Sequence, residues 1–164
     1  MQRILLTLVV FVFISNYAFC QIDDINGWDK AIWGMSKKEI NKLYGIRKLS
    51  PNSDDTYRMN NYYNVGNYNY EVWFNFRQDS LYYISIISEN KFNRNKKPPT
   101  KADCKALEDG LIKLYGNSHN TMTTSLGLWV ASWKFPSTSI RFQAGPGIEA
   151  RVDFSKKFPQ EKPW

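Results

Sequence analysis

The single histidine of the chain is the first residue to consider for catalysis. His119 directly follows Ser118 in the sequence GNSHN, just after a predicted helix. A nucleophile needs a base within hydrogen-bond reach in the folded protein, and being neighbours in sequence does not meet that condition. No nucleophile-elbow motif is present. A histidine in such a loop is typical of a surface or capping group, so we predict no catalytic residue and favour a protein that is not an enzyme.

Cys104 is the second candidate for chemistry. It lies in the first turn of a predicted helix, where the helix dipole lowers the pKa of a thiol. Its place in the apolar stripe of that helix favours a buried, unreactive thiol instead. One histidine and one cysteine do not form the usual zinc ligand set. The acidic pairs at 23–24 and 54–55 lack the spacing of a calcium loop, so we predict no metal and no cofactor.

The N-terminal segment predicts export. One arginine precedes the apolar run at residues 4–14, and polar and small residues follow it up to Gln21. This order is typical of a secretory signal peptide. The run is too short for a membrane-spanning helix, which needs about 20 apolar residues, and no later segment approaches that length. We therefore predict a signal peptide over residues 1–20 and no transmembrane span. The protein is expected to be periplasmic or secreted.

Lipidation of Cys20 is the less favoured alternative, because the residues before it, Tyr17-Ala18-Phe19, depart from the usual lipoprotein signal. Cleavage before Gln21 leaves residues 21–164, a normal size for a single domain. The remaining 21 basic and 15 acidic residues give a net charge of +6. Cys104 is then the only cysteine, so no internal disulfide can form and packing must stabilise the fold.

Aromatic residues before position 90 form the most informative candidate for binding. Aromatic side chains make up 16% of the chain. Flat amphipathic rings bury much area with few rotatable bonds, which suits a recognition surface. A second interpretation is that these rings cover a second small core. The predicted binding surface consists of Tyr62, Tyr68, Tyr70, Trp73, Tyr82 and Tyr83.

A basic segment separates the two halves of the chain, and residues 91–98 form the predicted linker. Its basic residues could attract phosphate-rich partners, and aromatic and basic residues together also suggest nucleic acid. The predicted export disfavours nucleic acid, and a solvated connector is the preferred interpretation. We expect a protein or an envelope polysaccharide as partner, and anionic lipid stays open. The basic residues concerned are Lys91, Arg94, Lys96, Lys97, Lys101 and Lys105.

Two helices have clear start and stop signals, from Ser36 to Gly45 and from Thr100 to Gly116. Each starts with a hydroxyl residue followed three positions later by an acid, which predicts a capping box. Each ends with the sequence KLYG, whose glycine terminates the helix. Gly110 inside the second helix suggests close backbone packing there. Alternating apolar residues predict strands at 56–64, 68–76, 81–87, 128–135, 139–143 and 148–154.

The order of these elements is a helix and three strands, a linker, and again a helix and three strands. Together with the repeated KLYG, this order indicates a duplicated unit. We predict an α+β fold, a tandem repeat of a helix plus three antiparallel strands with the helices packed on one face of the sheet. The repeats span about residues 28–90 and 99–157 of one domain, 21–164.

The stretch WGMSKKEINKLYG, from Trp33 to Gly45, resembles the first helix of the SmpA/OmlA outer-membrane lipoproteins. It is also similar to beta-lactamase-inhibitor-like proteins, and this resemblance implies a tandem repeat of a helical segment followed by antiparallel strands in a small exported protein. The chain departs from both groups, since it lacks a good lipoprotein signal and a disulfide, so no inhibitory residue carries over. The matching positions are Gly34, Met35, Ser36, Glu39, Leu43 and Gly45.

The expected function is that of an exported, non-enzymatic binding or interaction protein of the cell envelope. One alternative is a hydrolase of envelope polymers that uses scattered carboxylates. Another is a lipid-anchored outer-membrane assembly factor.

Overall fold

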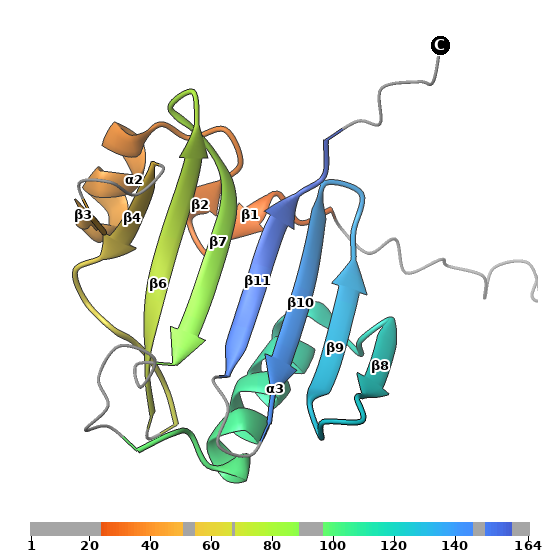
Figure 1. Cartoon of the computed structure of the whole chain (residues 1–164). Coiled ribbons are helices and arrows are strands. Elements are labelled where there is room, and N and C mark those ends of the chain that lie inside the picture. Colours follow the sequence, from red (N-terminus) through yellow and green to blue (C-terminus); the bar gives the residue numbers. More distant parts are fainter. Residues whose placement is uncertain (1–23, 51–54, 67, 89–96, 146–149, 159–164) are drawn as a thin grey trace, which may run out of the picture.

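The computed structural model of the 164-residue chain describes residues 24–50, 55–66, 68–88, 97–145 and 150–158. Strands hold 47% and helices 19% of these residues, in an α+β fold. Figure 1 shows one large twisted sheet with α3 lying across one of its faces. No helix in the described ranges is long and apolar enough to cross a membrane. The predicted signal peptide, Cys20 and most of the linker at 91–98 lie outside the described residues.

The two helices form where their caps predict them. Helix α2 spans Lys37–Tyr44 and helix α3 spans Lys101–Tyr115. Both predicted capping boxes are confirmed, because each N-cap hydroxyl accepts from the third helical N–H and the acid there accepts from the cap backbone. The glycines that follow the helices have φ values of 60° and 76°, a region that glycine enters without steric cost.

Nine strands form one antiparallel sheet, with the order β3-β4-β6-β7-β11-β10-β9-β8 and with β5 paired to β6. A separate small hairpin joins β1 and β2. The strand bounds are β1 Gly27–Trp28, β2 Ala31–Ile32, β3 Ile46–Lys48, β4 Thr56–Met59, β5 Tyr63–Val65, β6 Tyr68–Arg77, β7 Ser80–Ser88, β8 Asn120–Thr123, β9 Trp129–Lys134, β10 Thr138–Ala144 and β11 Arg151–Lys156.

The predicted tandem repeat of a helix plus three strands, with helices packed on one face of the sheet, is wrong. Five strands of the sheet follow α2 and four follow α3 within the described residues, and all nine belong to one sheet joined by the β7–β11 pair. The missed strands include β3 and β8, which are edge strands at the two ends of the strand order. Edge strands expose much of both faces, so they lack the apolar alternation that marks a half-buried strand.

The apolar core is built on alternate residues of the central strands. Val72 and Phe74 of β6 pair with Ile86 and Ile84 of β7, and all four are at most 1% exposed. The same cluster contains Ile40 of α2 and several residues of α3. Trp33, which precedes α2, also belongs to this cluster. The inference of close packing at Gly110 is wrong, because a Cβ there would meet no atom within 4 Å.

Candidate binding groove

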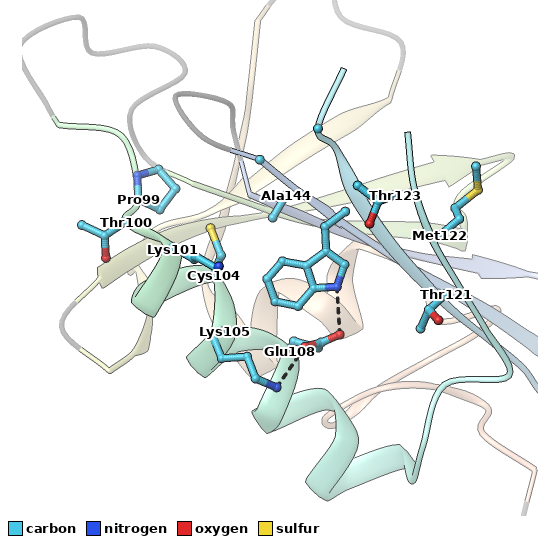
Figure 2. A pocket seen from close by; sticks show the side chains of 13 residues that line it. Pro99, Thr100, Lys101, Cys104, Lys105, Glu108, Thr121, Met122, Thr123 and Ala144 are labelled. Atoms are coloured by element: carbon cyan, nitrogen blue, oxygen red, sulfur yellow. Dashed lines mark hydrogen bonds and ion pairs between the residues drawn. The ribbon is translucent and has the colours of Figure 1, made fainter. Parts of the chain in front are cut away.

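A groove of about 930 Å³ lies between the first two turns of α3 and the edge of the sheet. Its other wall comes from β8, from Trp129 at the start of β9, and from Ala144 and Gly145 at the end of β10. Figure 2 shows Cys104, Lys105 and Glu108 on the helix, with Thr121 and Thr123 across the space from them. We call this space the α3–β8 groove. Its volume is within the range of about 300–1,000 Å³ that is typical of small-molecule sites.

The helical wall follows from the spacing of residues in α3. Lys101, Cys104, Lys105 and Glu108 are three or four residues apart, so they form one stripe along the helix. Cys104 and Glu108 are buried, whereas Lys101 and Lys105 are exposed at the rim. The helical wall thus combines a buried thiol and a buried carboxylate with two ammonium groups at the rim.

Trp129 is held in place by a buried carboxylate. Its indole Nε1–H donates to Glu108 Oε1 at 3.1 Å. Glu108 Oε2 accepts from Lys105 Nζ at 3.2 Å, and Lys105 also pairs with Asp109 at 2.6 Å. The hydrogen bonds that Lys105 donates to these two carboxylates, first to Asp109 and then to Glu108, raise the pKa of Lys105. Both oxygens of Glu108 are therefore engaged in orienting groove residues, and the ring of Trp129 is fixed as a half-exposed wall.

The sheet wall of the groove comes from β8, which is the strand at this end of the sheet, and from the start of β9. Thr121 pairs with Ala131 and Thr123 pairs with Trp129, so the two threonine side chains lie on the same face of the sheet as these partners. Ala131 is in the core and Trp129 contacts α3, so this is the face toward the helix. The four residues of β8 are all exposed. Helix α3 therefore does not fully cover β8 and the start of β9, and the uncovered space is the groove.

Cys104 is buried, as the apolar stripe predicts. Burial is the largest cause that raises the pKa of its thiol, and the nearby carboxylate of Asp103 adds to it. A thiol with a raised pKa holds little of the reactive thiolate at neutral pH. Cys104 therefore acts as an apolar residue of the groove floor.

The six residues of the predicted aromatic surface do not share one face of the sheet. Tyr70 is fully buried in the core, and its ring lies 5.3 Å from that of Tyr68, centroid to centroid. Burial raises the pKa of the Tyr70 phenol, whose oxygen has no hydrogen-bond partner among the described residues. Tyr68 is half-buried and donates to the carbonyl of Lys97 at 3.0 Å. Tyr62 lies outside any strand and is 45% exposed.

Trp73 and Tyr83 lie on the opposite face of the sheet from Tyr70, because side chains alternate along a strand. The indole of Trp73 donates to Glu71 at 3.0 Å, and the Tyr83 hydroxyl accepts from Arg151 at 2.9 Å. The ring of Tyr82 lies 6.4 Å from that of Tyr83. A contact role for Trp73, Tyr82 and Tyr83 stays a prediction. None of the six residues of the predicted surface lines the α3–β8 groove.

His119 is exposed, as predicted for a surface group, and its contacts are with the end of strand β9 and not with the end of helix α3. Its Nδ1 accepts from the backbone N–H of Lys134 at 2.8 Å, and its ring packs 5.8 Å from that of Phe135. Among the described residues, no group of three or more histidine, cysteine or acidic side chains is placed to hold a metal ion.

The groove residues that sequence reasoning missed are Glu108, Thr121, Thr123 and Trp129. Trp129 lies in the predicted strand 128–135, but the strand pattern does not indicate which helix the Trp129 side chain contacts. Glu108 follows Cys104 by four residues and so lies on the same face of the helix. An acidic residue on this apolar face was the sequence feature that could have indicated the groove. The residues of β8, Asn-Thr-Met-Thr, carry no apolar alternation, and nothing in the sequence marks them as a strand.

No protein-family model matches the chain, and no curated protein matches it. Among solved structures, the chain is similar to the crystal structure of a DUF4309 family protein (YjgB) from Bacillus subtilis subsp. subtilis str. 168. The sequence identity is 13%, the TM-score is 0.40, and the match covers 74% of this chain and 78% of that chain. A likeness of this size supports no conclusion about function, which therefore has to be argued from the groove.

Proposed function

We propose that this protein is an exported, non-enzymatic binding protein of the cell envelope, and that the α3–β8 groove is its ligand site. The single observation that carries the proposal is the groove itself, with its volume of about 930 Å³ and its tryptophan wall. Ligand sites combine a mostly apolar lining with a few oriented polar groups. Trp129, Cys104 and Ala144 supply the apolar part. Glu108 holds Trp129 and Lys105 in place, and Lys101 supplies an ammonium group that no described carboxylate pairs with.

The chemistry of the lining favours binding over hydrolysis. Glycoside hydrolysis by the usual mechanism needs two carboxyl groups that flank the scissile bond. Among the described residues that line the groove, Glu108 is the one carboxylate, and both its oxygens already accept hydrogen bonds. An anionic, apolar molecule fits this lining, because its charge can approach the Lys101 ammonium group at the rim while its apolar part contacts Trp129.

The binding proposal is tested with 8-anilinonaphthalene-1-sulfonate, an apolar fluorescent anion. We expect one molecule to bind per chain, with an increase in dye fluorescence. Thr123→Trp places a large ring in the groove and should weaken binding by about tenfold or more, since it removes contact with most of the apolar wall. Asn120→Trp adds the same ring at an exposed β8 position that does not line the groove, and should leave binding unchanged.

Equal dye affinity in the chain and in Thr123→Trp would refute the groove as the site. Export is tested separately by the mass of the mature protein from cells. A chain that begins at Gln21 supports the proposed signal cleavage. A diacylated Cys20 supports the lipid-anchored alternative, and an uncleaved N-terminus contradicts both.

A further inference from the structure

Strand β8 is an edge with free backbone groups. Among the described residues it pairs with β9 alone. The N–H of Thr124 donates to the carbonyl of Leu128 at 2.7 Å, which sets the direction of alternate backbone groups along β8. These groups alternate along an antiparallel strand, so the backbone N–H and C=O of Met122 also point toward β9. The backbone N–H and C=O groups of Thr121 and Thr123 therefore point away from the sheet.

The neighbouring strands support the same alternation. The N–H of Phe135 donates to the carbonyl of Thr138 at 2.8 Å, which directs the odd-numbered residues of β9 toward β10. The backbone N–H and C=O groups of the even-numbered residues of β9 then point toward β8. The carbonyl of Ser132 agrees with this, because it accepts from the His119 N–H at 2.8 Å. Two donors and two acceptors on β8 are thus available to another chain.

The two ends of the strand order, β8 and β3, differ in how they are protected. The opposite edge, β3, has three residues and includes exposed Arg47 and Lys48, and the N–H of Ile46 already donates to the Asn41 side chain at 2.8 Å. Charged side chains and short length are common ways to prevent pairing at an edge. Strand β8 has no charged residue. It is also the edge that borders the groove, so pairing and side-chain binding can occur together.

We propose that β8 and the α3–β8 groove bind an extended peptide segment as an added strand. This inference rests on the proposed function and names its ligand class. Residues of the peptide opposite Thr121 and Thr123 direct their side chains to the helix face, because cross-strand neighbours share a face. Apolar side chains at these alternate positions enter the groove beside Trp129. Backbone pairing supplies affinity and the alternate pockets supply selectivity in this mode of recognition.

Charge narrows the peptide class further. Lys101 lies at the groove rim and has no carboxylate partner among the described residues, whereas Lys105 already pairs with Glu108 and Asp109. An acidic residue next to the apolar ones complements the Lys101 ammonium group. The ligand is therefore an extended peptide with alternating apolar residues and an acidic group. A second copy of this chain, paired through β8, is the competing occupant.

The test uses a fluorescein-labelled hexapeptide, Thr-Leu-Thr-Leu-Thr-Glu, and measures binding by fluorescence anisotropy. Thr121→Pro removes an outward N–H that does not pair with β9, and Thr121→Ala is its matched control because both lose the hydroxyl. We expect the proline variant to bind about tenfold more weakly than the alanine variant, the effect of losing one hydrogen bond in a desolvated pair. Two N-methylated peptides provide a test that does not depend on folding of a variant. One is methylated at the amides of the odd-numbered residues and the other at the amides of the even-numbered residues.

One N-methylated register should abolish binding and the other should leave it within about twofold, since only one set of amides faces β8. Equal affinity of the chain for the two N-methylated peptides would overturn strand addition. Equal affinity of Thr121→Pro and Thr121→Ala for the unmodified peptide would also overturn it. Dye binding without any peptide binding would also overturn it and leave the proposed function standing. Loss of both would refute the proposed function. Sedimentation that shows a dimer, converted to monomer by Thr121→Pro, would assign the edge to a second copy and also overturn the peptide proposal.

Discussion

Replacement of Thr138 by valine is expected to destabilise the fold strongly, although the two side chains have nearly the same shape. Thr138 is fully buried at the start of β10. Its hydroxyl accepts from the indole N–H of Trp33 at 2.7 Å, and it donates to the carbonyl of Ile25. One hydroxyl therefore ties the N-terminal segment to a central strand more than 100 residues away.

The magnitude follows from the groups that lose their partner. Valine keeps the packing but leaves the Trp33 N–H and the Ile25 carbonyl without a hydrogen bond. Each unsatisfied buried group costs about 1–3 kcal/mol. Ile25 is only partly buried, so water can compensate part of its loss. We expect a decrease of about 2–4 kcal/mol in the free energy of unfolding, which corresponds to a Tm lower by about 5–15 °C.

The assay is urea unfolding of the chain from Gln21 onward, followed by far-ultraviolet circular dichroism because one variant removes a tryptophan. A double-mutant cycle combines Thr138→Val with Trp33→Phe, and should show a coupling of about 1 kcal/mol or more. Thr121→Val makes the same change at an exposed residue of β8 and should cost less than about 0.5 kcal/mol. A loss below about 0.5 kcal/mol for Thr138→Val, or a coupling near zero, would refute the reasoning.

Four further predictions concern the pH response, two glycine positions and one buried hydroxyl. Burial is the main cause that raises the pKa of Tyr44 and of Tyr115 to about 12 each, whereas unfolded tyrosine ionises near pH 10. The unfolded state then loses protons first, so stability is full below about pH 10 and falls between about pH 10 and 12. Tyr115→Phe should reduce this fall, measured as the change in urea midpoint between about pH 9 and about pH 11. Gly27 has φ 142°, and a Cβ there would lie 1.9 Å from a backbone oxygen, so Gly27→Ala should cost more than about 2 kcal/mol. Gly110→Ala, at a helical site with open space, should instead stabilise by about 0.5–1 kcal/mol, and a loss of stability in urea unfolding would contradict this. Tyr70→Phe removes a buried hydroxyl without a partner and should raise the unfolding free energy by up to about 1 kcal/mol, whereas a decrease would show that the hydroxyl has a partner.

Local signals in the sequence determined the local structure well. The capping boxes at Ser36 and Thr100 involve residues three positions apart, and both form as predicted. The alternation in 68–76 and the apolar residues on both faces of 81–87 predict β6 and β7 nearly to their ends. These features depend on contacts within one element, so their information lies within a few neighbouring residues.

The number of strands and the way they join could not be obtained in the same manner. Strand β8 forms because β9 offers it backbone partners, and its own residues are polar and exposed. The aromatic residues illustrate the same limit. Alternation places Tyr70 and Trp73 on opposite faces of β6, but it does not say that Tyr70 lies on the face that is buried.

The sequence by itself determined the two helices, the central strands and a buried Cys104. Only the tertiary structure decided the single nine-stranded sheet and the groove at its edge. The groove walls come from residues 99–108, 121–129 and 144–145, which meet only because β10, β9 and β8 pair in that order beside α3. The physical reason is that strand pairing uses backbone groups common to all residues, so which strands become neighbours is decided by the packing of the whole chain.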